Sequence, residues 1–153
     1  MSDAYRVLFV CLGNICRSPM AHGVFCAKAD AAGLTVAVDS AGTGGWHAGN
    51  PPDPRACTTA AERGYDIADL RARQVRRADF AEFDLIVAMD RSNLRALEEM
   101  RPAGARARLR LFRHPQTADV PDPYYEGGFA QVLDMIERGA DALIAELTQK
   151  GRA

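Results

Sequence analysis

Lysine, long hydrophobic runs and metal-binding motifs are all scarce in this chain. Only Lys28 and Lys150 are lysines among 19 basic residues, and 20 acidic residues leave a net charge of −1. A chain this close to neutrality lacks the charge excess that attracts nucleic acid or an anionic membrane surface. No apolar run reaches about 18 residues and no signal-peptide pattern is present, so we expect neither a membrane span nor export.

The cysteines are few and their spacing does not suit zinc. Cys11, Cys16, Cys26 and Cys57 form no pair of the spacing that zinc sites use. Without a sign of export we expect reduced thiols, a cytoplasmic location and no metal or cofactor. The length of 153 residues suits one domain, and we expect residues 1–153 to form it.

The most informative segment is residues 11–18, in which Cys11 and Arg17 bracket five residues. Residues 5–10, apolar except for Arg6, lead into it, and a helix start follows at Ser18. This pattern predicts a strand, a tight loop and a helix N-terminus. Backbone N–H groups of such a loop converge on one point, where the helix dipole favours a thiolate. The predicted chemistry is attack by Cys11 on a bound phosphate-like oxyanion.

The residues of this loop have distinct expected roles. Arg17 presents a planar fork that can bind two oxygens of a phosphoryl group. Gly13 lets the backbone approach a ligand, and Asn14 tolerates the left-handed conformation. Ser18 is expected to hydrogen-bond the Cys11 sulfur, to cap the following helix, or both. Taken alone, the cysteine–arginine spacing also fits an inert buried thiol.

Apolar and amphipathic segments alternate along the chain. Strands are predicted at residues 5–10, 35–40, 84–89 and 108–112, helices at 19–32, 54–63, 78–83, 91–100 and 129–149, and loops at 42–52 and 114–128. Strands joined through helices imply an α/β fold: an open, mostly parallel four-stranded sheet with helices on both faces. Ligands of such sheets bind beyond the carboxyl ends of the strands, where Cys11 stands.

Three short motifs occur in order along the chain: residues 10–21 (VCLGNICRSPMA), 39–43 (DSAGT) and 122–125 (DPYY). Together they resemble the signature segments of the low-molecular-weight protein tyrosine phosphatases, and the resemblance covers essentially the whole chain. It implies a metal-independent hydrolase that removes phosphate from phosphotyrosine in a protein, a tyrosine kinase among the candidate substrates, and releases inorganic phosphate. We expect the protein to act as a monomer.

The resemblance also implies residue roles. Cys11 is the nucleophile, Arg17 binds the phosphate, and Asp122 protonates the leaving oxygen before acting as base on the hydrolytic water. By residue type alone an Asp-Pro pair more often marks a turn, and the neighbouring Asp119 is the alternative acid. The implied phosphate-binding loop consists of Leu12, Gly13, Asn14, Ile15, Cys16 and Ser18.

The walls of the pocket follow from the same resemblance. Trp46, Tyr124 and Tyr125 are placed at the rim, where flat aromatic walls suit a phenyl ring and a deep slot excludes the shorter phosphoserine. The alternative for Trp46 is that it covers the core, and the rim is the favoured position. Ser40 is expected to hydrogen-bond Asn14 and so to hold the shape of the loop.

The remaining cysteines and histidines have smaller expected roles. In relatives the pair equivalent to Cys11 and Cys16 can form a protective, reversible disulfide; simple packing of Cys16 is the alternative. Cys26 and Cys57 are assigned to packing. Of the histidines, which are His22, His47 and His114, none is given a catalytic role, and only His47 is a candidate for substrate contact.

One departure from the family pattern is visible at Leu70. Many relatives carry a histidine there that pairs with the aspartate of the segment containing Asp90. Without that partner, Asp90 is expected only to cap a helix.

Three other functions remain to be weighed. Arsenate reduction needs two further cysteines near residues 85–97 to relay a disulfide, and the sequence has none there. Protein arginine phosphatases on this scaffold tend to have threonine at the position of Ile15, so Ile15 favours phosphotyrosine. A non-catalytic phosphate-binding module would be expected to have lost Cys11 or Asp122, and both are present.

Overall fold

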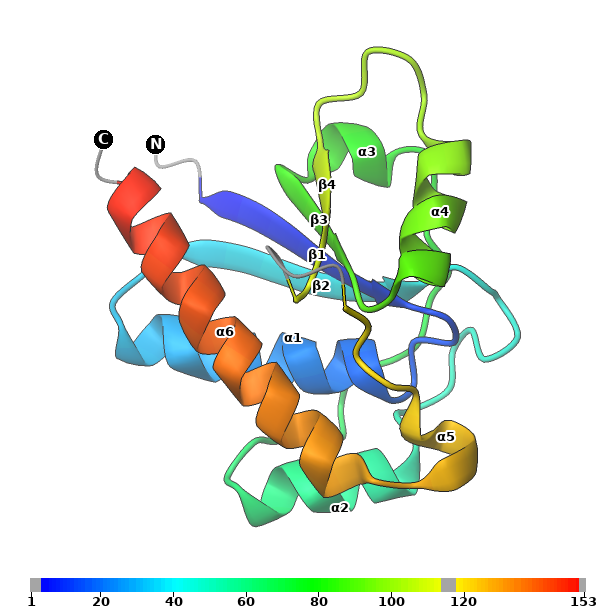
Figure 1. Cartoon of the computed structure of the whole chain (residues 1–153), viewed down its shortest axis with the longest axis vertical. Helices are drawn as coiled ribbons and strands as arrows, with labels where there is room; N and C mark the ends of the chain where they lie inside the picture. Colours follow the sequence, from blue (N-terminus) through cyan, green and yellow to red (C-terminus); the bar gives the residue numbers. More distant parts are fainter. Residues whose placement is uncertain (1–3, 114–117, 152–153) are drawn as a thin grey trace.

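Four strands form one parallel sheet in the order β2-β1-β3-β4 (Figure 1). The computed structural model describes residues 4–113 and 118–151. The strands are β1 (Tyr5–Cys11), β2 (Val36–Gly42), β3 (Leu85–Ala88) and β4 (Arg108–Leu111). All three pairings are parallel. The predicted open, mostly parallel sheet is confirmed.

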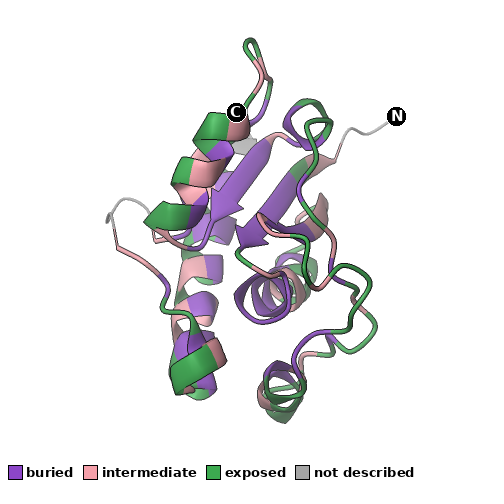
Figure 2. Ribbon diagram, turned by 90° about the vertical axis from the view of Figure 1, so that its right-hand side faces the viewer, coloured by how far each residue is buried: buried purple, intermediate pink, exposed green. Residues whose placement is uncertain are grey.

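Helices cover both faces of the sheet (Figure 1). On one face lie α1 (Arg17–Ala31), α2 (Pro54–Glu62) and α6 (Phe129–Gly151), and on the other lie α3 (Asp79–Glu82) and α4 (Arg91–Met100). Side chains of a strand point alternately to its two faces. In β1, Val7 and Phe9 accordingly join the core against α1 and α6, whereas Leu8 and Val10 join the core against α3 and α4. The sheet is buried on both sides, as Figure 2 shows.

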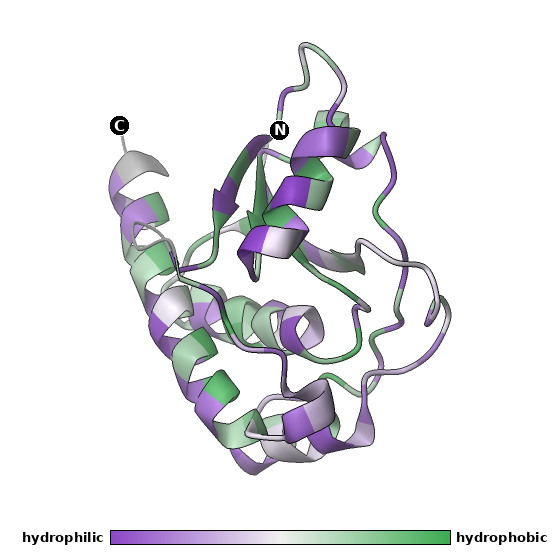
Figure 3. Cartoon of the chain, turned by 45° about the vertical axis from the view of Figure 1, so that its right-hand side comes forward, coloured by the Kyte–Doolittle hydropathy of each residue, from purple (hydrophilic) through white to green (hydrophobic). Residues whose placement is uncertain are grey.

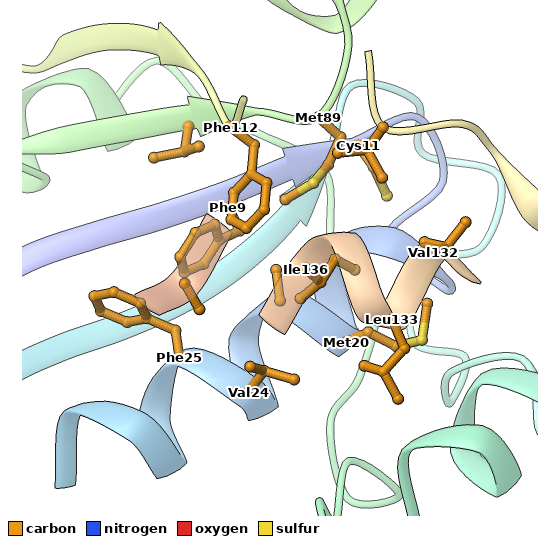
Figure 4. Close-up of a cluster of buried hydrophobic side chains, with 14 of the residues drawn as sticks. Phe9, Cys11, Met20, Val24, Phe25, Met89, Phe112, Val132, Leu133 and Ile136 are labelled. Atoms are coloured by element: carbon orange, nitrogen blue, oxygen red, sulfur yellow. The ribbon is translucent and has the colours of Figure 1, made fainter. Parts of the chain in front are cut away.

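The larger core lies between the sheet, α1 and α6. Its centre is Phe9 (Figure 4). The ring centre of Phe9 lies 5.4 Å from that of Phe25 in α1 and 6.0 Å from that of Phe112, and both pairs are arranged edge to face. Leu133 and Ile136 of α6 close the cluster. Full burial of such side chains stabilises the fold by about 1.5–3 kcal/mol each.

The outer helices are apolar on one side only (Figure 3). In α4, Leu97 is buried while Glu98 and Glu99 face solvent. In α6 the apolar side faces α1 and the sheet. Within residues 4–113 and 118–151, no helix combines the length and apolar character that a membrane crossing needs.

Two predicted boundaries are wrong. The first helix begins at Arg17, not at residue 19, and its N-cap is Cys16, with no side chain capping it; Ser18 is therefore not the cap. The predicted loop 114–128 contains a short helix, α5 (Pro123–Glu126), because the Asp122 side chain accepts the N–H of Tyr124. Residues 114–117, with His114, lie outside the described part of the chain.

Candidate active site

The loop after β1 folds around the side chain of Cys11. It joins Cys11, the last residue of β1, to Arg17, the first of α1. Asn14 has a φ of 59°, the left-handed conformation expected of it. Because no side chain caps α1, its first backbone N–H groups are suited to an anionic ligand.

The Cys11 sulfur is surrounded by hydrogen-bond donors. The side chain is 3% exposed, the backbone N–H of Asn14 donates to Sγ at 3.3 Å, and Ser18 Oγ lies 3.0 Å from it. Since Asn14 Nδ2 donates to Ser18 Oγ at 2.7 Å, the Ser18 hydroxyl proton is left for Sγ or for the carbonyl of Ala41 at 3.4 Å. The predicted contact between Ser18 and Cys11 is present, and through it the hydroxyl can donate a hydrogen bond to the sulfur.

Arg17 is a buried cation, 2% exposed, held by groups from two distant segments. Its Nη1 donates to Asp90 Oδ2 at 2.7 Å and to the carbonyl of Val120 at 2.9 Å, and its Nη2 lies 3.5 Å from Asp122 Oδ2. Burial works against the charge, but the neighbouring Cys11, Asp90 and Asp122 outweigh it and raise the pKa of Arg17. The guanidinium is therefore fixed and always charged.

Asp90 was expected only to cap a helix, and it also holds Arg17. Its Oδ1 accepts the N–H of Asn93 and caps α4, while its Oδ2 accepts from Arg17. Asp90 lies two residues after the end of β3, and it reaches Arg17 because β3 is next to β1 in the sheet, an order that the sequence alone does not give. Leu70 packs, partly buried, against the larger core.

The two candidate acids have different surroundings. Asp122 caps α5 and reaches the pocket with Arg17 nearby. Asp119 instead accepts hydrogen bonds from the backbone N–H and the guanidinium of Arg91. The Arg91 side chain, then its backbone N–H, lower the pKa of Asp119, which keeps that carboxyl ionised and unsuited to donate a proton.

A pocket of about 380 Å³ opens above the Cys11 sulfur. Its lining contains Cys11, Leu12, Gly13, Ile15, Cys16, Arg17, Trp46, His47, Asp122, Tyr124 and Tyr125. The three predicted wall residues are thus brought together. Trp46 is 72% and Tyr125 87% exposed, so they form the rim rather than cover the core. His47 also lines the pocket.

Arg55, which sequence reasoning missed, supports the Tyr124 wall. Its guanidinium lies 5.5 Å from the Tyr124 ring centre and 4.8 Å from that of Phe129. Asp53 accepts from Arg55 Nε at 3.0 Å and from Nη2 at 2.8 Å and so holds it there. Stacking of this kind limits the positions open to the tyrosine ring.

The predicted hydrogen bond between Ser40 and Asn14 is wrong. Ser40 Oγ lies 3.2 Å from Nδ1 of His22, on α1. Asn14 Oδ1 instead accepts the backbone N–H of Arg73 at 3.0 Å. The support that the sequence assigned to Ser40 therefore comes from the segment before α3.

The motif at residues 39–43 contributes a glycine that the loop needs. A Cβ on Gly42 would stand 2.7 Å from the carbonyl oxygen of Leu12, closer than any real contact. The following N–H groups bind the loop: Thr43 donates to the Cys11 carbonyl and Gly44 to that of Leu12, each at 2.9 Å. The end of β2 thus packs directly on the loop.

The other cysteines differ from Cys11 in their surroundings. Cys16 is buried, and this burial is the main cause that raises its pKa. The negative charges of Asp53, Cys11 and Asp122 raise it further, so Cys16 stays a neutral thiol. Cys57 packs partly against the core, whereas Cys26 is exposed, contrary to its assignment to packing. Within the described residues, no three His, Cys, Asp or Glu side chains gather as metal ligands.

Comparison with known proteins agrees with this geometry. The family described as low molecular weight phosphotyrosine protein phosphatase matches residues 6–153. A low molecular weight protein-tyrosine-phosphatase of Streptomyces coelicolor is 47% identical over 162 residues, covering 97% of this chain and 98% of its own.

Solved structures are similar over the same length. The crystal structure of YfkJ from Bacillus subtilis has a TM-score of 0.90 and 39% identity, covering 97% of this chain and 98% of that one. A protein tyrosine phosphatase from Entamoeba histolytica has a TM-score of 0.88 and 37% identity, with 98% and 100% covered. The chain therefore belongs to the low molecular weight phosphotyrosine protein phosphatase family.

Proposed function

We propose that the protein is a protein tyrosine phosphatase that hydrolyses phosphotyrosine through a cysteinyl-phosphate intermediate. The observation that carries this proposal is the convergence of three side chains at one pocket. Cys11 lies at its base with donors on its sulfur, Arg17 is fixed beside it, and Asp122 stands 3.5 Å from the arginine. Phosphoryl transfer needs little more than this positioning and electrostatic stabilisation.

In the first step the Cys11 thiolate attacks phosphorus and the bond from phosphorus to the tyrosine oxygen breaks. The phenolic oxygen takes the proton of Asp122, and tyrosine leaves. Arg17 and the N–H groups at the start of α1 bind the non-bridging phosphate oxygens. The product is the cysteinyl-phosphate with Asp122 ionised.

In the second step water attacks the phosphorus of the cysteinyl-phosphate. Asp122 accepts a proton from that water, the bond between sulfur and phosphorus breaks, and Cys11 leaves as the thiolate. Inorganic phosphate is released. The donors from Asn14 and Ser18 stabilise the sulfur both as attacking and as leaving group.

The shape of the pocket supports a phosphorylated aromatic ring as substrate. The sulfur is buried, while the rim residues Trp46 and Tyr125 are largely exposed, so a substrate must pass the aromatic walls to reach it. Tyr124 and Tyr125 meet edge to face with ring centres 4.8 Å apart. A phenyl ring fits such walls, whereas a phosphoserine side chain is too short to span them.

We further propose a phosphotyrosine-containing protein, such as a tyrosine kinase, as partner. The four strands form one sheet with a core on each face, which supports a single domain over residues 1–153, and we propose that the enzyme acts as a monomer. A nucleophilic thiol needs reducing surroundings, which supports a cytoplasmic location.

The test is phosphate release from a phosphotyrosine peptide, with a thiol reductant and no added metal. Wild type and Cys57→Ser, a cysteine outside the pocket, are expected to turn over, and Cys11→Ser is not. A matched phosphoserine peptide is expected to react far more slowly. Equal activity in wild type and Cys11→Ser would overturn the role of Cys11. Turnover of phosphoarginine but not of phosphotyrosine would overturn the substrate.

A further inference from the structure

We propose that the ion pair between the partly exposed Arg73 and the fully buried Asp79 is a positioning element of the catalytic loop, acting on Cys11 through Asn14 and Ser18. The inference rests on the nucleophilic role proposed for Cys11. Neither Arg73 nor Asp79 is among the residues that line the pocket. The pair therefore acts through the loop and not by touching the substrate.

Asn14 links the sulfur to the segment before α3. Its backbone N–H donates to Cys11 Sγ at 3.3 Å, and its Nδ2 donates to Ser18 Oγ at 2.7 Å. Asn14 has the left-handed backbone that asparagine tolerates better than most residues with a side chain, and its side chain is also held from outside the loop. The N–H of Arg73, donating to Oδ1 at 3.0 Å, is the bond that reaches Asn14 from outside the loop.

Arg73 is fixed by two carboxylates. Its Nη1 and Nη2 donate to the two oxygens of Asp79 at 2.9 and 3.1 Å, and its Nε donates to Asp39 at 3.1 Å. Its carbonyl also accepts the N–H of Gly42 at 2.8 Å. Both backbone polar groups of Arg73 thus support the loop: its N–H binds Asn14, and its carbonyl binds Gly42, which packs on the loop.

Asp79 is the anchor of this arrangement. Its side chain is fully buried and also accepts the N–H of Arg76 at 2.8 Å. Burial disfavours its charge, but the bonds from Arg73 and Arg76 outweigh burial and hold the pKa of Asp79 below its usual range. A buried carboxylate that lost its partner would be costly, so the bidentate pair has little freedom to move.

Without the charge of Asp79, the guanidinium of Arg73 would keep the carbonyl of Gln74 and one carboxylate, Asp39, whose side chain is 46% exposed to competing water. The Arg73 N–H could then shift from Asn14, and the Asn14 amide could turn from Ser18. The Ser18 hydroxyl would no longer be directed at the sulfur. The expected result is a less stabilised thiolate in a folded protein.

A second ion pair serves as a matched control. Arg63, at the end of α2, donates to Asp134, Glu137 and the carbonyl of Ala130, all on α6. This cluster ties two helices together away from the loop. Its disruption is expected to lower stability without changing the reactivity of Cys11.

The test measures the rate of Cys11 alkylation by iodoacetamide as a function of pH in the full chain, with the site located by mass spectrometry. Asp79→Asn keeps the shape of the side chain but removes its charge. In this variant the pH at which the alkylation rate is half-maximal, the midpoint, is expected to rise by about one unit, which corresponds to a tenfold change in the equilibrium between thiol and thiolate. We expect kcat on phosphotyrosine peptide to fall on the order of tenfold, within the roughly 100-fold that a 1 Å misplacement can cause. The KM should change less. Glu137→Gln should leave the midpoint in place.

Two further variants keep the test decisive. If Asp79→Asn does not fold, Arg73→Lys keeps the charge but loses the bidentate geometry, and should shift the midpoint in the same direction. The double variant Arg73→Lys/Asp79→Asn should shift it no further than the larger single effect, because the two residues act as a unit.

Failure of the inference differs from failure of the proposed function. The same midpoint in wild type and in folded Asp79→Asn and Arg73→Lys would overturn the positioning role alone. Unchanged phosphatase activity in Cys11→Ser would overturn the proposed role of Cys11 and the inference with it.

Discussion

Asp90 accepts a hydrogen bond of 2.7 Å from Nη1 of Arg17 and thereby joins the end of β3 to the loop that follows β1. Asp90 is itself fixed, because its other oxygen caps α4 through the N–H of Asn93 at 2.7 Å. The strand order changes direction between β1 and β3, the place where open α/β sheets bind ligands. The arginine is thus oriented by the sheet before any phosphate arrives.

Replacing Asp90 by Asn should therefore weaken phosphate binding and catalysis together. The amide keeps the shape but loses the charge, and hydrogen bonds to charged groups contribute about 1.5–3 kcal/mol. We expect kcat/KM on phosphotyrosine peptide to fall by about tenfold or more, and inhibition by inorganic phosphate to weaken. Asp134→Asn, which also removes a carboxylate from an arginine, should leave both unchanged. Equal kinetics for Asp90→Asn and wild type would contradict the positioning of Arg17.

The fall in kcat on removal of the Asp122 carboxyl group should depend on the leaving group of the substrate. General acid catalysis contributes roughly 10²–10⁴-fold, and most where the leaving oxygen is basic. In Asp122→Asn we expect a large fall in kcat for phenyl phosphate and a much smaller one for p-nitrophenyl phosphate, whose leaving group needs little protonation. Asp119→Asn, which loses only the contact with Arg91, is the control and should retain activity on both. Equal losses on the two esters would show that Asp122 is not the acid.

Much of the fold could be predicted because its pattern is local. The apolar run of residues 7–10 predicts a strand buried on both faces, and the helical period of the apolar residues in α6 predicts a helix buried on one face. Both predictions hold whichever segments pack against these residues. The short helix α5 was missed although it starts with an Asp-Pro pair, the signal that correctly predicted α2 at Asp53. A four-residue helix has too few turns to show a period.

The nucleophile loop could be predicted for the same reason, whereas its supports could not. Cys11, Arg17 and Ser18 lie within eight residues of one another. Asp90 and Arg73 reach the loop from segments 73 and 59 positions away, through tertiary contacts. Predicting them needs the sheet order and the register, which one sequence does not specify.

Cys16 should be far less reactive than Cys11. Burial and the nearby negative charges raise the pKa of Cys16, and only a thiolate attacks an alkylating agent at a useful rate. At neutral pH we expect iodoacetamide to label Cys11 at least about 100-fold faster than Cys16, measured by peptide mass spectrometry. In denaturing urea the two should react at similar rates, which is the control. Labelling of Cys16 first in the folded protein would contradict this assignment.

His22 should make the folded state less stable as the pH falls. Burial lowers its pKa, and Asp39 only partly opposes the shift. From about pH 6.5 downward the unfolded chain therefore binds a proton that folded His22 does not, and the free energy of unfolding falls by at most about 1.4 kcal/mol per pH unit from this residue.

Urea unfolding at pH 7, 6 and 5 would give the free energy of unfolding of wild type and of His22→Gln. The difference between the two proteins in how steeply this free energy falls with pH is about the contribution of His22. Glutamine can keep a hydrogen bond to Ser40 but has no proton to gain, so its stability should fall less over this range. Ser40→Ala removes that bond and leaves the histidine buried, so it should keep the wild-type slope. If His22→Gln lost stability as steeply as wild type, the acid sensitivity would lie elsewhere in the molecule.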